Sequence, residues 1–203
     1  MTFGIGPTGT GKSHLAIAAA VSLLAREPFK YLVLTRPYIL SEGEVMTAER
    51  RLDVVEEGQL TPIEDELSAL IGHEPMNRLK EEGRLQVLPL GLRGRTFNDG
   101  LLLVDDAQNL TIPQMRMALT RMGRSARIVI TGDPHQSELH GDDVSGLTHA
   151  LKLLDCHSFC VVHQFREPEI VRNPVVAEIE ALYSGALSIA ERGKAPSARI
   201  GAL

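Results

Sequence analysis

One short run near the start of the chain limits the fold more than any other feature. It reads Gly-Pro-Thr-Gly-Thr-Gly-Lys-Ser over residues 6–13, a glycine and lysine spacing that forms a phosphate-binding loop between a strand and a helix. Glycines let backbone N–H groups turn inward, and the following helix adds the positive end of its dipole. We therefore predict a strand over 2–5 and a helix over 13–25, which is rich in alanine and leucine.

The loop defines the candidate nucleotide-binding residues. Lys12 is expected to reach the β- and γ-phosphates of ATP, and the Ser13 hydroxyl to coordinate Mg²⁺. A glycine-rich turn without a ligand is the alternative, and the flanking strand and helix argue against it. The predicted cofactor-binding set is Gly6, Pro7, Thr8, Gly9, Thr10, Gly11, Lys12, Ser13 and His14.

Strands and helices alternate along most of the remaining chain. Apolar runs predict strands over 31–35, 85–88, 101–104, 127–131 and 158–162. Helices are expected after the capping-box pattern at Thr111 with a stop at Gly123, from the cap Ser145 to about 154, and over 174–183. This alternation predicts an α/β fold, a mostly parallel, doubly wound sheet with helices on both faces.

The stretch over 37–84 departs from this alternation. It is acidic and too long for an ordinary connection, so we interpret it as a helical insertion at the edge of the sheet, with helices over 62–71 and 75–82. A solvated helical cover explains it as well as a binding surface does. At 203 residues the chain can bury one sizeable core, and we predict a single domain over 1–203 with a C-terminal tail over 185–203.

Two acidic residues follow the apolar strand expected over 101–104. The carboxyl end of a parallel strand is where α/β sheets bind ligands, so Asp105 is the predicted Mg²⁺ partner and Asp106 the group that polarises the attacking water. An acidic turn after a core strand is the alternative. Beside the glycine loop, the catalytic interpretation is stronger.

A turn after the strand over 127–131 supplies a third element. It carries Asp133 and Gln136 to the same edge of the sheet, where a glutamine amide can sense the γ-phosphate and orient water. Taken alone, Gly-Asp-Pro is simply a good turn. Behind two matching motifs, Gln136 is predicted to be a sensor.

Composition restricts the remaining classes. The net charge of −5 gives no global positive field for nucleic acid, no apolar run approaches the roughly 18 residues of a membrane span, and no signal-peptide pattern opens the sequence. Cys156 and Cys160 suit a reducing cytoplasm, where we place the protein. Their spacing to the nearby histidines fits no zinc pattern, so a buried thiol is the preferred interpretation of Cys160.

These motifs, in this order, resemble the PhoH family of phosphate-starvation-inducible ATPases, relatives of superfamily-one helicases. The resemblance extends from the start of the chain to about residue 184. The matching segments are 6–13, 34–37, 93–99, 104–109, 114–117, 119–121, 131–133 with Gln136, 145–147 and 171–174.

The resemblance implies a RecA-like P-loop ATPase core that uses ATP and Mg²⁺, acts on or with single-stranded RNA, and assembles into a homo-oligomeric ring. It assigns phosphate, metal, Walker B and sensor roles to Gly9, Gly11, Lys12, Ser13, Asp105, Asp106 and Gln136. The family usually has glutamate where Asp106 stands, and residues 43–67 match it poorly. The base-reading glutamine of many relatives lies upstream of the loop, which leaves base preference open.

The arginines carry the remaining predictions. Arg36 lies in a segment that helicase relatives use for nucleic acid, and Arg93 and Arg95 flank a glycine before the Walker B strand. Arg172 is the predicted catalytic arginine, supplied by a neighbouring subunit, with Arg166 and then Arg95 as alternatives. Surface ion pairing with the acidic insertion is the competing interpretation for each of them.

The predicted function is Mg²⁺-dependent ATP hydrolysis by an in-line water, coupled to RNA. Two alternatives remain open. A nucleotide-gated assembly module would bind ATP with little turnover, and the shorter Asp106 keeps that alternative alive. A small-molecule kinase would use the same loop but needs an acceptor pocket and a lid, and the Gly-Asp-Pro-His-Gln turn argues against it.

Overall fold

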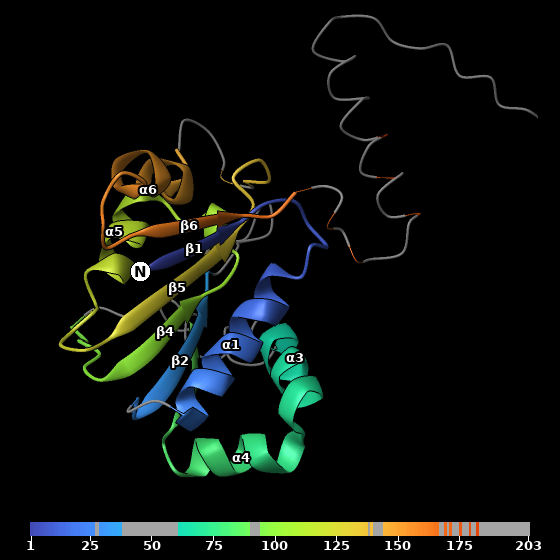
Figure 1. The fold of residues 1–203 in the computed structure, drawn as a ribbon, viewed down its shortest axis with the longest axis vertical. Helices are drawn as coiled ribbons and strands as arrows, with labels where there is room; N and C mark the ends of the chain where they lie inside the picture. Colours follow the sequence, from blue (N-terminus) through green and yellow to red (C-terminus); the bar gives the residue numbers. More distant parts are fainter. Residues whose placement is uncertain are drawn as a thin grey trace, which may run out of the picture.

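A computed structural model describes residues 1–26, 29–37, 61–89, 94–137, 139 and 144–166, together with 169, 171, 175, 179 and 182. Its centre is one six-stranded sheet in which every pairing is parallel. The strand order is β3-β2-β4-β5-β1-β6 (Figure 1). The strands are β1 (Thr2–Ile5), β2 (Tyr31–Arg36), β3 (Leu85–Pro89), β4 (Gly100–Val104), β5 (Arg127–Gly132) and β6 (Val161–Gln164).

Helices cover both faces of the sheet. On one face α1 (Lys12–Arg26) packs over β2, β4 and β5, with α3 (Thr61–Ile71) beside it and α4 (His73–Glu81) next to β3. On the other face lie α5 (Ile112–Leu119) and α6 (Gly146–Leu154), which pack against each other and, through α6, on the short helix η1 (Ala107–Asn109) (Figure 1). This is the doubly wound α/β arrangement predicted from the alternation of elements, and it is consistent with a RecA-like P-loop core.

Alternation along the central strands divides the core in two. On β4, Leu102 points into the layer formed with α5 and α6, whereas Leu101 and Leu103 point into the layer formed with α1, α3 and α4. All five residues of β4 are buried, as expected for a strand covered on both faces. The strand therefore ends with little freedom of position, and Asp105 follows it directly.

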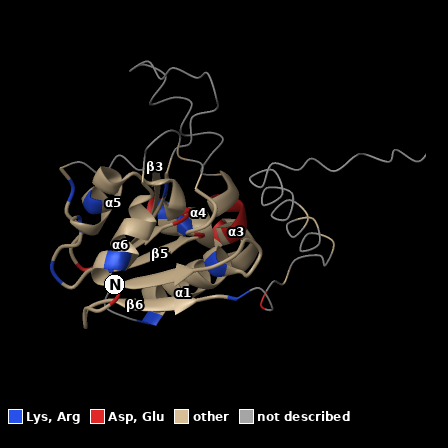
Figure 2. Ribbon diagram, turned by 90° about the horizontal axis from the view of Figure 1, so that it is seen from above, with Lys and Arg blue, Asp and Glu red and all other residues tan. Residues whose placement is uncertain are grey.

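The two helices predicted in the acidic stretch are present and begin or end within two residues of the expected bounds. Figure 2 shows the acidic residues of α3, whose sequence includes Glu64, Asp65 and Glu66. Ile63 and Leu67 on the opposite side of this helix are buried in the α1 layer. The predicted insertion is thus packed on the core through α3 and α4, whereas its residues 38–60 lie outside the described part of the chain.

Three local predictions need correction. The last strand begins at Val161 rather than at 158, because β6 pairs in register with β1 and the preceding chain turns, with the Cys160 N–H bonded to the His157 carbonyl. Helix α5 ends at Leu119, well before Gly123, although its capping box at Thr111 is confirmed. Ser145 precedes α6 as predicted, but its hydroxyl does not cap the helix; it donates to the Gln108 carbonyl oxygen, 3.0 Å away.

The predicted C-terminal helix falls mostly outside the described residues. Within that segment Val175, Ile179 and Leu182 are described, and each is helical and exposed. The tail over 185–203 also lies outside the described part. No helix among the described residues is long and apolar enough to cross a membrane.

Candidate functional site

Four segments bring polar side chains to the carboxyl edge of the sheet. They are the glycine loop after β1, Arg36 at the end of β2, Asp105 after β4 and the turn after β5. The registers align these ends, with Ile5 opposite Gly132 and Thr35 opposite Val104. Because all the strands are parallel, residues far apart in sequence meet at one edge.

The glycine loop has the backbone shape that its sequence predicts. Gly9 and Gly11 have φ angles of 86° and 78°, in the left-handed region that favours glycine. Inside the loop, the Thr10 hydroxyl donates to the Pro7 carbonyl oxygen at 2.9 Å, and Lys12 Nζ donates to the same oxygen at 2.6 Å. The loop therefore closes around the head of Lys12 at the start of α1.

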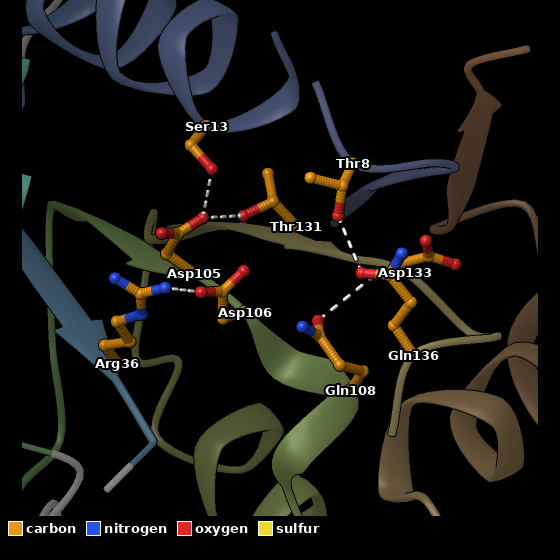
Figure 3. A network of polar contacts seen from close by, with 9 residues as sticks. All are labelled: Thr8, Ser13, Arg36, Asp105, Asp106, Gln108, Thr131, Asp133 and Gln136. Carbon is orange, nitrogen blue, oxygen red and sulfur yellow. Dashed lines mark hydrogen bonds and ion pairs between the residues drawn. The ribbon is translucent and has the colours of Figure 1, made fainter. Parts of the chain in front are cut away.

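Asp105 is the centre of a short hydrogen-bond network. Its Oδ1 accepts a 2.6 Å hydrogen bond from the Ser13 hydroxyl and a second 2.6 Å bond from the Thr131 hydroxyl (Figure 3). Asp105 is only 4% exposed, so these donors replace the water that an ionised carboxylate would otherwise need. The structure thus brings together the two residues predicted to hold Mg²⁺.

Asp106 is placed differently from its neighbour. Its Oδ2 forms an ion pair with Arg36 Nη2, and both side chains are about one quarter exposed (Figure 3). The backbone at Asp106 has φ 52° and ψ 41°, a left-handed conformation that aspartate tolerates better than most residues. The predicted water-polarising group and the predicted nucleic-acid arginine are therefore direct partners.

The turn after β5 links the predicted sensor to the glycine loop. The Thr8 hydroxyl donates to Gln136 Oε1 at 2.7 Å, and the Asp133 N–H donates to Gln108 Oε1 at 3.1 Å (Figure 3). Asp133 itself is 5% exposed and accepts from the His135 N–H within the turn. Asp133 thus shapes the turn, while Gln136 lies against the loop.

Helix α3 adds an acidic side chain that the sequence did not single out as part of the site. Glu66 lies 3.3 Å from His14 Nδ1, next to Ser13 at the start of α1. Burial raises the pKa of the Glu66 carboxyl, the negative charge of Asp105 raises it further, and His14 and Arg36 partly oppose the shift. The insertion is thereby in electrostatic contact with the metal-binding end of the site.

The other predicted arginines do not gather at this edge. Arg95 Nη2 donates to Gln86 Oε1 at 2.7 Å, and its guanidinium lies over the Phe97 ring. The Arg166 N–H donates to the Glu169 carboxylate. Arg93 and Arg172 lie outside the described residues. Of these arginines, only Arg36 is shown in contact with a predicted catalytic residue.

Several polar residues of the site were missed by sequence reasoning. Thr131 stood within a matched motif and could have been found from its place at the end of β5, beside the Walker B strand. Gln108 likewise stood in the matched run after Asp106. Glu66 had no such signal, because its position depends on how α3 packs on α1. The buried Thr35 hydroxyl, at the same edge, has no hydrogen-bond partner among the described residues.

The cysteines form no part of the site. Cys160 is buried and Cys156 exposed, both as free thiols, and burial raises the pKa of the Cys160 thiol. Among the described residues, no group of three or more histidine, cysteine, aspartate or glutamate side chains is arranged to hold a metal ion. A Mg²⁺ site built on Ser13 and Asp105 would instead use one hydroxyl and one carboxylate.

Comparison with known proteins agrees with this geometry. The PhoH-like protein family matches residues 1–184. A PhoH-like protein of Bacillus subtilis is 36% identical over 90% of this chain and 58% of its own length, and one of Synechocystis is 36% identical over 90% of this chain and 56% of its own. Protein PhoH of Escherichia coli K12 is 27% identical over 91% of this chain and 53% of its own length. The chain thus spans little more than half the length of these relatives, and it belongs to the PhoH-like protein family.

Proposed function

We propose that the chain binds ATP with Mg²⁺ at the carboxyl edge of its sheet and hydrolyses the γ-phosphate. The observation that carries this proposal is the 2.6 Å hydrogen bond between Ser13 and Asp105, residues 92 positions apart in sequence. A hydroxyl and a carboxylate are the hard oxygen donors that Mg²⁺ prefers. Their contact at the first turn of the helix after a glycine loop is the arrangement that nucleotide hydrolysis needs.

The residues present fit both ligands. The backbone N–H groups of the loop and the start of α1 favour anionic oxygens. Lys12 is held within the same loop at 2.6 Å from the Pro7 carbonyl, where its ammonium group can exchange that partner for phosphate oxygens. When bound, Mg²⁺ would neutralise charge on the β- and γ-phosphates.

The water-activating residues follow from the same network. Asp106 is the carboxylate available to accept a proton from the attacking water, and Gln136 can orient that water from the opposite side of the loop. Aspartate is one methylene shorter than the glutamate usual in the family, and misplacement by about 1 Å can cost on the order of a hundredfold in rate. The Arg36 ion pair adds a second restraint on the Asp106 carboxylate.

Coupling to RNA is proposed through that ion pair. An RNA phosphate bound by Arg36 would compete with Asp106 for the guanidinium and leave the carboxylate available for water. The net charge of −5 leaves attraction of RNA to local arginines such as Arg36, Arg93 and Arg95. We expect the stimulation to fall steeply with salt, as phosphate contacts do.

The experiment is phosphate release from ATP with Mg²⁺, with and without single-stranded RNA. Lys12→Ala provides the blank, and Arg36→Ala tests the coupling. We expect turnover in the wild-type chain, stimulation by RNA, and loss of that stimulation in Arg36→Ala. Tight ATP binding with no phosphate release under any condition would contradict the hydrolase proposal.

That outcome would favour the second candidate, a nucleotide-gated assembly module. The specific observation on its side is the engagement of Asp106 by Arg36, which occupies the one carboxylate placed to activate water. Including a panel of small acceptor molecules in the same assay separates a third class. Phosphate transferred to an acceptor rather than to water would mark a kinase.

A catalytic arginine from a neighbouring subunit remains part of the proposal. Arg172 is the first candidate, and the neighbouring Val171 donates its N–H to the Gly9 carbonyl of its own chain at 3.0 Å. Mixing Lys12→Ala with Arg172→Ala chains therefore distinguishes two cases. Recovery of hydrolysis means that Arg172 acts between subunits; no recovery in co-assembled chains means that it does not.

A further inference from the structure

One end of the sheet is bare on the face that carries α1. Helix α1 packs mainly over β2, β4 and β5, whereas β1 and β6 form the far end of the strand order (Figure 1). Because side chains alternate along a strand, Phe3 enters the α5–α6 layer while Thr2 and Gly4 face the α1 side. Parallel sheets are normally covered on both faces, so this end lacks a covering element among the described residues.

A groove of about 280 Å³ occupies this position. Its walls include Ala16, Ala19 and Leu23 of α1, with Gly4 of β1 and Phe165 after β6. Alanine and glycine leave room for bulkier side chains, and Leu15 at the same wall is 53% exposed. A small-molecule site would need several convergent polar groups in a mostly apolar pocket. These mostly apolar walls fit an apolar helix face better.

The same chain carries such a face. Val175, Ile179 and Leu182 are helical, and spacings of four and three residues place them on one side of a helix. They are 57%, 46% and 72% exposed, so most of their apolar surface is in contact with solvent. We call these three residues the apolar stripe.

We propose that the groove between α1 and the β1–β6 end of the sheet is a docking surface for the apolar stripe of a second copy of this chain. Stripe and groove are both exposed in one chain, so each copy offers a donor surface and an acceptor surface. Contacts between two different surfaces are head-to-tail, and they close into rings or extend into filaments. This inference does not depend on nucleotide hydrolysis.

The docking surface also touches the nucleotide loop. Phe165, a wall of the groove, lies directly over Gly6, where an added Cβ would come within 2.4 Å of its carbonyl oxygen. Four residues before the stripe begins, the Val171 N–H is bonded to the Gly9 carbonyl. One segment thus runs from the groove past the loop to the stripe, which places the interface between copies beside the phosphate site.

Disulfide trapping tests the proposal directly. In a Cys156→Ser background, one chain carries Ala19→Cys in the groove and another carries Ile179→Cys in the stripe. Mixed under mild oxidation, the two chains should form a disulfide-linked heterodimer, because a disulfide requires Cα atoms within roughly 7 Å. Neither chain alone should give that product.

A chain with both cysteines identifies the occupant. Head-to-tail docking predicts a ladder of linked chains on a denaturing gel. If instead the doubly substituted chain closes only on itself, and the mixed single variants do not link, the stripe fills its own groove and the proposal is wrong.

Mass in solution gives an independent measurement on the full chain. Light scattering should show a multiple of the single-chain mass that falls to one chain in Ile179→Asp and in Ala19→Asp. Leu153→Asp is the matched control, because this residue is 55% exposed on α6, on the opposite face of the sheet. An unchanged mass in both groove and stripe variants, with circular dichroism showing folded protein, would overturn the proposal.

Discussion

At the scale of single residues, the buried end of β4 determines the chemistry of the site. Asp105 is ionisable and almost fully buried, yet two hydroxyls donate to the same carboxylate oxygen at 2.6 Å. Ser13 would turn toward Mg²⁺, whereas Thr131 would continue to hold the carboxylate. Thr131 is thus a positioning residue whose contribution appears in stability as well as in activity.

Thr131→Val removes that donor at nearly constant volume. Because hydrogen bonds to charged groups contribute about 1.5–3 kcal/mol, we expect the free energy of unfolding to fall by about 2 kcal/mol, as measured by urea denaturation. Thr120→Val is the control, since this exposed hydroxyl on the surface of α5 should change stability by about 0.5 kcal/mol or less. Equal effects of the two substitutions would remove Thr131 from its proposed role.

Glu66 makes stability depend on pH. Its pKa is raised above the ordinary value of 4.5, chiefly by burial, so the fold favours the protonated carboxyl. The stability from this preference is present below pH 4.5 and is lost as pH rises through the raised pKa. We expect Glu66→Gln to match the wild-type chain near pH 4 and to become progressively more stable than it toward neutral pH.

The measurement is the thermal midpoint of both proteins from pH 4 to pH 8. Glu74→Gln controls for the loss of one negative charge, because the Glu74 side chain is 88% exposed on α4. A difference between Glu66→Gln and wild type that stays constant across the range would contradict the linkage.

At the scale of elements, α5 and α6 approach closely enough that one glycine decides their packing. A Cβ on Gly146 would lie 2.5 Å from the Thr111 carbonyl oxygen and 2.7 Å from Met115 Cβ. The nearest atom belongs to the backbone at the start of α5, where the capping box holds the chain. The first turn of α6 therefore has no room for a side chain.

Gly146→Ala should destabilise the protein although alanine favours helices. Overpacking costs about 1–3 kcal/mol, against a gain of about 1 kcal/mol in helix propensity, so we expect a net loss of about 1 kcal/mol in urea denaturation. Gly4→Ala is the matched control, because its Cβ would meet only ordinary contacts at 3.6 and 3.7 Å. A more stable Gly146→Ala chain would show that the two helices can separate at little cost.

At the scale of the whole molecule, the site joins the two layers of the fold. The glycine loop and α1 belong to one face, whereas η1 and the turn after β5 lead to the other, and the Thr8–Gln136 and Ser13–Asp105 contacts connect them. A ligand held between these segments would stabilise both layers together. Binding should therefore raise the cooperative unfolding temperature.

With Mg²⁺ and ATP at about 100 times the dissociation constant, stabilisation amounts to about 2.7 kcal/mol. For a domain of this size that corresponds to a rise of roughly 5–10 °C in the thermal midpoint. Differential scanning fluorimetry should show this rise in the wild-type chain and not in Lys12→Ala. An equal rise in both proteins would place ATP somewhere other than the glycine loop.

The sequence by itself determined the features that depend on neighbouring residues. The glycine loop, the helix that follows it, the buried strand before Asp105 and the capping box at Thr111 each follow from local spacing and chemistry. The order of the motifs was also enough to identify the family. The last strand was misplaced because its apolar run includes Phe159, which is 54% exposed in the turn before β6.

Only the tertiary structure decided which of these features touch. The order β3-β2-β4-β5-β1-β6 differs from the order along the chain, and local periodicity does not specify which strands become neighbours. The Arg36–Asp106 ion pair, the approach of Glu66 to His14, and the bare end of the sheet beside α1 all follow from that order and from helix packing. These contacts join residues from separate elements, so they exist only once the sheet has formed.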